Sequence, residues 1–200
     1  MDTQPRKSQA IAFTALMSAS ALIISSLRVE LPFYPLTFLK LDFAEIPSLL
    51  TFMLVAPKWS YFCALLHYFG LLSRGGDPLG PTMKFTAVLS MLFGMHWGLR
   101  SKSTKLWLAL LLGMGLRSFI MALANYILLS FLFPSWLDYS KFLLNAAGIG
   151  VSEWTDVIVL TLVLVTTYNC IHTLFSFIPA KLIASQVERR LQTVRLTRES

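Results

Sequence analysis

Long runs of apolar residues, interrupted by short polar breaks, dominate the chain. A membrane-spanning helix needs about 20 mostly apolar residues. Two runs, 8–27 and 106–132, reach that length without the polar face that a soluble amphipathic helix would show. Together with the shorter runs, the pattern predicts six spans, at about 8–27, 44–56, 59–73, 82–99 and 106–132, with the sixth inside 153–190.

The composition assigns the chain to the integral membrane class. Hydrophobic residues make up 56% of the sequence and charged residues 14%, whereas soluble chains average about 45–50% and about 25%. We therefore expect an all-α integral membrane protein with a single six-helix domain (1–190) and a basic tail (191–200). The first apolar run is expected to be a retained span rather than a cleaved leader.

The distribution of basic residues predicts the orientation. The two termini, the 57–58 turn and the 100–105 loop hold eleven Lys and Arg residues, and the opposite side holds five. Because basic loops stay in the cytoplasm, both termini are expected there. This places a long first loop (28–43), a Gly/Pro turn (73–81) and a long fifth loop (134–152) together on the outer face.

The last apolar segment is too long for a single crossing. The 38 residues of 153–190 would form a helix far longer than a bilayer core of about 30 Å. We expect a break at the polar stretch 166–169, with 153–165 folded over the outer face and a span at 167–189 kinked by Pro179. The alternative is a span at 153–178 followed by an amphipathic tail, which buries Asn169.

Several polar residues near the outer face are candidate binding groups. Asn169 and His172 share a helix face, and their side chains could either join neighbouring spans or hydrogen-bond a planar polar ligand. Asn125 lies in the outer half of the fifth span. Arg117 lies deeper, and no carboxylate is expected at its depth on the first five spans, which favours a structural role.

Charged residues at the outer mouth also have simple structural explanations. Lys84 and Lys40 could extend to the lipid headgroups. Asp42 and Glu45 could cap the second span, since carboxylates favour helix N-termini.

Small residues four apart indicate close helix contacts. Ala15 and Ala19 form such a pair in the first span, and Gly94 and Gly98 form another in the fourth. Each pair leaves a groove in which a second helix can approach closely.

No enzyme motif is present in the sequence. SRGGDPLGP lacks the GK[ST] of a phosphate-binding loop, and neither HExxH nor GxSxG occurs. The three histidines lie on separate predicted spans without an evident carboxylate partner, and Cys63 and Cys170 have no metal-ligand spacing. We expect no catalytic residue, no metal and no cofactor.

The chain resembles the substrate-binding (S) components of energy-coupling factor (ECF) vitamin transporters, and among these the riboflavin type. The resemblance covers most of the chain and depends on size, six spans, LKLDFAEIP after a proline-rich loop, RGGDPLGPTMKF, an NY in the fifth span and YNCIH in the last. Riboflavin-type members carry PFN-x-x-(Lys or Gln) at that last place. Here Thr167, Tyr168 and His172 replace the Pro, the Phe and the Lys or Gln.

The resemblance implies a site and partners. It implies that the first loop closes over a vitamin on the outer face, and that the first-span groove of Ala15 and Ala19 docks onto a transmembrane coupling protein carrying two ABC-type ATPases. Riboflavin would then be the transported ligand in a prokaryotic plasma membrane. The residues expected to contact it are Asn169, His172, Asn125, Lys84, Asp42 and Tyr168, with Leu41 and Phe43 covering the ring.

Three hypotheses follow. The first is a riboflavin-binding and uptake subunit without catalytic activity. The second is an S component for another vitamin or small metabolite, motivated by His172. The third, a small membrane enzyme or scaffold, depends only on the polar residues of the outer face.

Overall fold

The computed structural model describes residues 7–100 and 106–199, with side chains described through residue 190. It contains seven α-helices, one π-helical turn and one short hairpin in the described residues. Their order is α1 (Lys7–Leu27), β1 (Glu30–Pro32), β2 (Lys40–Asp42), α2 (Ile46–Leu54), α3 (Pro57–Leu72), α4 (Leu79–Leu99), α5 (Leu106–Ile127), η1 (Leu128–Leu132), α6 (Ser135–Ala146) and α7 (Trp154–Glu199).

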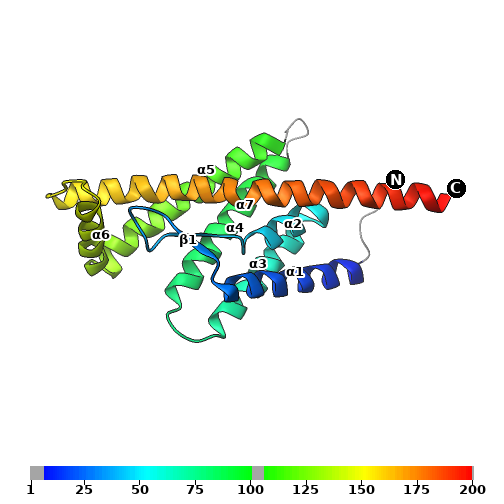
Figure 1. Ribbon diagram of the computed structural model, residues 1–200, viewed down its shortest axis with the longest axis horizontal. Coiled ribbons are helices and arrows are strands. Elements are labelled where there is room, and N and C mark those ends of the chain that lie inside the picture. Colours follow the sequence, from blue (N-terminus) through cyan, green and yellow to red (C-terminus); the bar gives the residue numbers. More distant parts are fainter. Residues whose placement is uncertain (1–6, 101–105, 200) are drawn as a thin grey trace.

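Helix α7 extends along the whole molecule (Figure 1). Helices α2 and α5 contact α7 directly, α1 packs on α2 and α3, and α4 lies between α3 and α5. Prolines in the first turns of α2 and α3 start these helices without the loss of an internal hydrogen bond.

The predicted break in the last segment is wrong, because α7 is one helix from Trp154 onward and continues through Pro179. The break was expected because Asn169 would be costly inside a membrane. In the structure the Asn169 amide donates to Val165 O at 2.8 Å and accepts from Arg117 at 2.9 Å, so its burial is compensated.

Both predicted outer loops contain regular structure. The first loop folds into the antiparallel β1–β2 hairpin, in which Leu31 pairs with Leu41. The fifth loop contains α6, whose buried face contributes Leu137 and Leu144 to an apolar cluster with α7. The π-helical turn η1 ends the fifth span at residue 132, as the sequence predicts.

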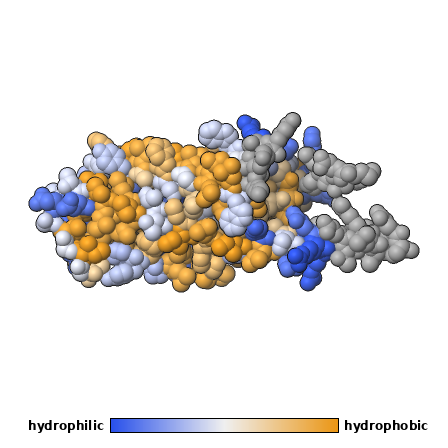
Figure 2. Space-filling model, turned by 90° about the horizontal axis from the view of Figure 1, so that it is seen from above, coloured by the Kyte–Doolittle hydropathy of each residue, from blue (hydrophilic) through white to orange (hydrophobic). Residues whose placement is uncertain are grey.

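Within residues 7–100 and 106–199, three helices are long and apolar enough to cross a membrane: Lys7–Leu27, Leu106–Leu132 and Trp154–Arg190. Figure 2 shows apolar side chains over the middle of the molecule and more hydrophilic ones towards its ends. Helix α2 has nine residues and is about 14 Å long, less than half the thickness of a bilayer core. The count of six spans therefore stays a prediction.

The tryptophans lie at helix ends, as expected for side chains at a membrane interface. Trp59, Trp97 and Trp107 are close to the adjoining ends of α3, α4 and α5, and Trp136 and Trp154 are close to the starts of α6 and α7. Lysines lie over three of these rings, such as Lys181 Nζ at 5.2 Å from the centroid of Trp107.

The predicted small-residue contact of the fourth span is confirmed, and it lies within the chain. A Cβ on Gly94 would be 2.6 Å from Leu112 O on α5, and one on Gly98 would be 2.6 Å from Ala109 Cα. Gly113 of α5 is equally close to α4, with Met91 O at 2.8 Å from its ideal Cβ. Glycines on both helices thus allow the two backbones to touch.

Gly113→Ala should destabilise the protein because its methyl group would overlap the α4 backbone. We expect a loss of about 1–3 kcal/mol in unfolding free energy, measured by thermal or denaturant unfolding in detergent. Gly115→Ala is the matched control on the same helix, since its ideal Cβ has no atom within 4 Å. Equal stability of the two variants would contradict the tight α4–α5 contact.

Candidate ligand-binding site

A cavity of about 470 Å³ lies beneath the β1–β2 hairpin. Its wall comes from the end of α1, the hairpin, the starts of α2 and α4, the outer part of α5 with η1, the start of α6 and the middle of α7. The volume falls within the range of about 300–1,000 Å³ that small-molecule sites usually have.

The deepest polar feature of the wall is an ion pair between Glu45 and Arg117. The two guanidinium nitrogens donate to the two carboxylate oxygens at 2.6 and 2.9 Å, and each side chain is only 1% exposed. The prediction that no carboxylate reaches Arg117 is therefore wrong. Glu45 occupies the N-cap position of α2 but makes no capping hydrogen bond, and its side chain points to α5 instead.

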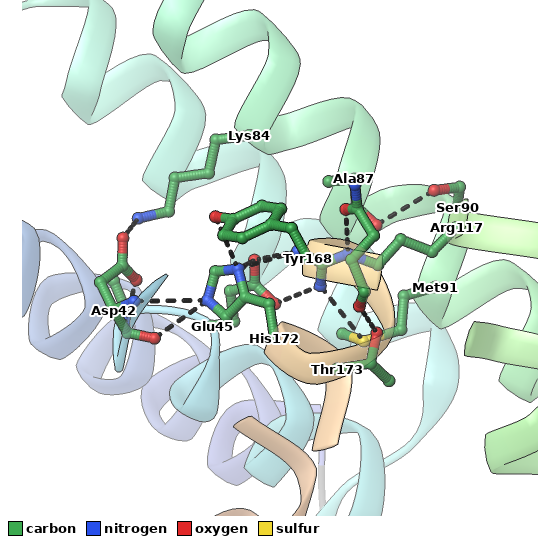
Figure 3. Close-up of polar contacts among 12 residues, drawn as sticks. Asp42, Glu45, Lys84, Ala87, Ser90, Met91, Arg117, Tyr168, His172 and Thr173 are labelled. Carbon is green, nitrogen blue, oxygen red and sulfur yellow. Dashed lines mark hydrogen bonds and ion pairs between the residues drawn. The ribbon is translucent and has the colours of Figure 1, made fainter. Parts of the chain in front are cut away.

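Two residues of α7, Asn169 and His172, contact the guanidinium group of this ion pair; His172 is labelled in Figure 3. Asn169 Oδ1 accepts from Arg117 Nε at 2.9 Å, and His172 Nδ1 lies 3.1 Å from Arg117 Nη2. His172 Nδ1 is also 3.6 Å from Glu45 Oε1, so this histidine has the carboxylate neighbour that the sequence did not reveal. The four side chains join α2, α5 and α7.

The hairpin is tied to the helices at strand β2. The hydroxyl of Tyr168 donates to Lys40 O at 2.6 Å, and the Nε2 atom of His172 lies 3.1 Å from Asp42 O. Lys84 of α4 donates to Asp42 Oδ2 at 2.5 Å (Figure 3). Lys84 is thus an ion-pair partner, and it does not extend freely towards headgroups. Lys40 likewise pairs with Glu30 across the hairpin, at 2.7 Å.

Aromatic side chains from two outer segments meet at the cavity. Phe38 of the hairpin loop and Trp136 of α6 both line it, and their ring centroids are 6.4 Å apart. Tyr139 packs against Phe38 at 6.3 Å. The hairpin loop and the segment around α6 therefore cover the cavity jointly.

Most of the predicted contact residues reach the cavity: Asn169, His172, Asn125, Lys84, Asp42 and Tyr168 all line it. Leu41 and Phe43 are not part of the lining. Side chains alternate along a strand, so Leu41 points away from the face that Lys40 and Asp42 present. Phe43 stacks on Phe175, with ring centroids 4.6 Å apart.

The lining also contains residues that were not predicted to contact a ligand, among them Glu45, Arg117, Phe38 and Trp136. A signal existed for the first two, because a buried arginine needs a carboxylate and Glu45 stands alone at the start of an apolar segment. Nothing in the sequence pattern distinguishes Phe38 or Trp136 from the other aromatic residues of the outer loops.

The fold and the cavity describe the class first: a helical membrane protein with a cavity whose volume is typical of small-molecule sites. Residues 9–184 match the family model described as "ECF transporter, substrate-specific component". The chain therefore belongs to the family of substrate-specific (S) components of ECF transporters, which are substrate-binding transport subunits and not enzymes.

Two known proteins are similar to this chain. The riboflavin transporter RibU of Staphylococcus aureus (strain TCH60) is 30% identical over 118 residues, which are 58% of this chain and 62% of that protein. The matched part thus spans less than two thirds of the relative's length. A solved structure of the S component of a bacterial ECF transporter superposes with a TM-score of 0.66 at 22% identity, over 93% of this chain and 99% of that one. The superposition confirms the fold.

Replacing one residue of the buried ion pair should lower the unfolding free energy more than replacing both. Glu45→Gln or Arg117→Met alone leaves one charge buried without its counterion, and we expect each to lower the unfolding free energy by about 3–5 kcal/mol. The double variant Glu45→Gln/Arg117→Met buries no net charge and should be more stable than either single variant. Additive losses in a denaturation series would contradict strong coupling between the two side chains.

Proposed function

We propose that this S component binds riboflavin or a close flavin and serves its uptake. The observation that carries the proposal is the hydrogen-bonding capacity left in the cavity once the chain's own contacts are counted. Asn125 uses one amide hydrogen on Met121 O, which leaves one N–H and its oxygen. Asn169 retains one N–H after its bonds to Val165 and Arg117.

Lys84 adds two further donors, since only one of its three N–H bonds points at Asp42. The hydrogen-bonding groups of Asn125, Asn169 and Lys84 that remain free are therefore mostly donors, with the Asn125 oxygen as the amide acceptor. The isoalloxazine edge of a flavin offers the complement: carbonyl and ring-nitrogen acceptors around a single N–H. The aromatic pair Phe38 and Trp136 supplies flat apolar surface for its rings.

The charges in the wall favour a neutral ligand. Glu45 is paired with Arg117, Asp42 with Lys84 and Glu30 with Lys40. Arg28, Arg74 and Asp77 also line the cavity, but they are exposed. Among the described lining residues, a charged ligand would therefore find no buried counterion that is not already paired. Riboflavin is neutral, and the riboflavin transporter from S. aureus supports the same choice.

A second candidate is an S component for another neutral vitamin. It is favoured by His172, which stands where riboflavin-type members carry Lys or Gln. Its ligand would still need to be flat and rich in acceptors, because the free donors of Lys84, Asn125 and Asn169 are the same. Membership in the S-component family speaks against the enzyme hypothesis.

Titration of the detergent-purified protein with riboflavin tests the proposal. Flavin fluorescence should be quenched with one flavin bound per chain, and thiamine or biotin should not compete. Asn125→Leu should weaken binding about 10- to 100-fold by removing a buried donor and acceptor. Thr167→Val is the matched control, because Thr167 is exposed and bonds only to Val163 O. Tight binding of a different vitamin with no effect of riboflavin would select the second candidate.

The orientation and assembly belong to the same proposal. We propose that the cavity end faces outward and that six membrane segments (1–190) form one unit with cytoplasmic termini. The basic stretch 191–200 would then lie on the cytoplasmic side of a prokaryotic plasma membrane. In this arrangement the subunit works with a membrane coupling protein and two ABC-type ATPases. Ala15 and Ala19 are exposed on α1 and stay available for docking.

Larger side chains at Ala15 and Ala19 should block transport without affecting ligand binding. Ala15→Leu/Ala19→Leu should abolish uptake in cells that contain the coupling module while riboflavin affinity in detergent stays unchanged, because neither residue lines the cavity. Val159→Leu, on an exposed position of α7, is the control and should transport normally. Normal uptake by the double variant would show that α1 does not dock through this groove.

A further inference from the structure

His172 has no hydrogen-bonding capacity left for a ligand. His172 is 2% exposed. Its Nδ1 atom lies 3.1 Å from Arg117 Nη2 and 3.1 Å from the Tyr168 hydroxyl. Its Nε2 atom faces the backbone of Asp42, with the carbonyl oxygen at 3.1 Å and the amide nitrogen at 3.4 Å. Both ring nitrogens are thus used by the chain itself.

The two partners of His172 have different mechanical roles. Arg117 is fixed by its ion pair with Glu45 deep in the helices. Asp42 belongs to β2, the strand of the hairpin above the cavity. His172 therefore connects the hairpin to the buried ion pair of Glu45 and Arg117.

Other contacts on β2 act in the same direction. Tyr168, one helical turn before His172, donates to Lys40 O, and Lys84 holds the Asp42 side chain from α4. Strand β1 bonds across the hairpin, through its pairing with β2 and the ion pair of Glu30 with Lys40. In the part of the chain that the structure describes, it has no comparable hydrogen bond to a helix. The hairpin is thus held through one strand.

We propose that His172 is a positioning residue that fixes strand β2 above the cavity, and that it does not contact the ligand. The proposal deepens the proposed function and rests on it only for the effect on flavin release. It also replaces the expectation that His172 binds the ligand's polar edge. A residue at this place can then differ from Lys or Gln without changing which ligand is recognised.

Hydrogen exchange of the ligand-free protein tests the anchoring role. In His172→Ala the hairpin amides of residues 30–42 should exchange about tenfold faster, as expected for a lost buried hydrogen bond, while α3 and α4 keep their protection. His96→Ala is the matched control, because His96 bonds to Tyr61 and does not line the cavity. Unchanged hairpin exchange in folded His172→Ala would overturn the proposal, since a ligand contact alone has no effect without ligand.

The ring of His172 offers a second test that needs no variant at this position. Nitrogen NMR of histidine-labelled protein, assigned by removing His67 and His96 in turn, should show one tautomer of His172 with both ring nitrogens hydrogen-bonded. The same tautomer and shifts within error should persist when riboflavin is added. A change of tautomer on adding riboflavin, or a hydrogen bond from His172 to the flavin, would overturn the proposal.

Flavin dissociation separates this proposal from the proposed function. His172→Ala should release riboflavin about tenfold faster, whereas His172→Gln, which keeps a donor and an acceptor, should restore most of the wild-type rate. If the wild-type protein does not bind riboflavin at all, the proposed function fails while the exchange and NMR results still decide the role of His172. Unchanged release from a loosened hairpin would overturn the claim that β2 controls release.

Discussion

The ion pair between Glu45 and Arg117 is the interaction on which the rest of the structure depends. Burying a carboxylate and a guanidinium is costly, and the cost is offset only when geometry and additional hydrogen bonds are good. Here the pairing is bidentate. Asn169 and His172 satisfy further N–H groups of the guanidinium. Because these partners come from the N-cap of α2 and from α7, the requirement to compensate one buried arginine of α5 fixes three helices relative to one another.

The same requirement explains why α7 is continuous. A helix that crosses an apolar region with Asn169 and His172 in its middle would be destabilised if those groups lacked partners. Arg117 and Asp42 provide these partners. Asn169 and His172 therefore line the cavity, and α7 stays helical through the polar stretch 166–169. Sequence reasoning assigned the cost to Asn169 alone, and it placed a break where the structure instead brings α5 and the hairpin into contact.

Much of the architecture could be predicted because it depends on local pattern. The apolar runs located α1, α4 and the stretch of α5 and η1 closely, and glycine spacing indicated that another helix approaches α4 at Gly94 and Gly98. What could not be predicted depends on partners far apart in the chain: Glu45 and Arg117 are 72 residues apart. Strand alternation decides that Lys40 and Asp42 face the cavity while Leu41 does not, and that required knowing that the first loop forms a hairpin.

One network of hydrogen bonds and ion pairs connects the cavity and the hairpin, but its residues differ in whether they can still bind a ligand. Groups with unused donors, such as Asn125 and Lys84, are placed to recognise a ligand, whereas His172 is fully occupied between Arg117 and Asp42. A ligand that enters therefore meets a wall whose buried charges, Glu45 and Arg117, are already paired with each other. On α7, Asn169 is then available to the ligand, whereas His172 holds strand β2. The two roles are separate although the two residues are only three apart on the same helix face.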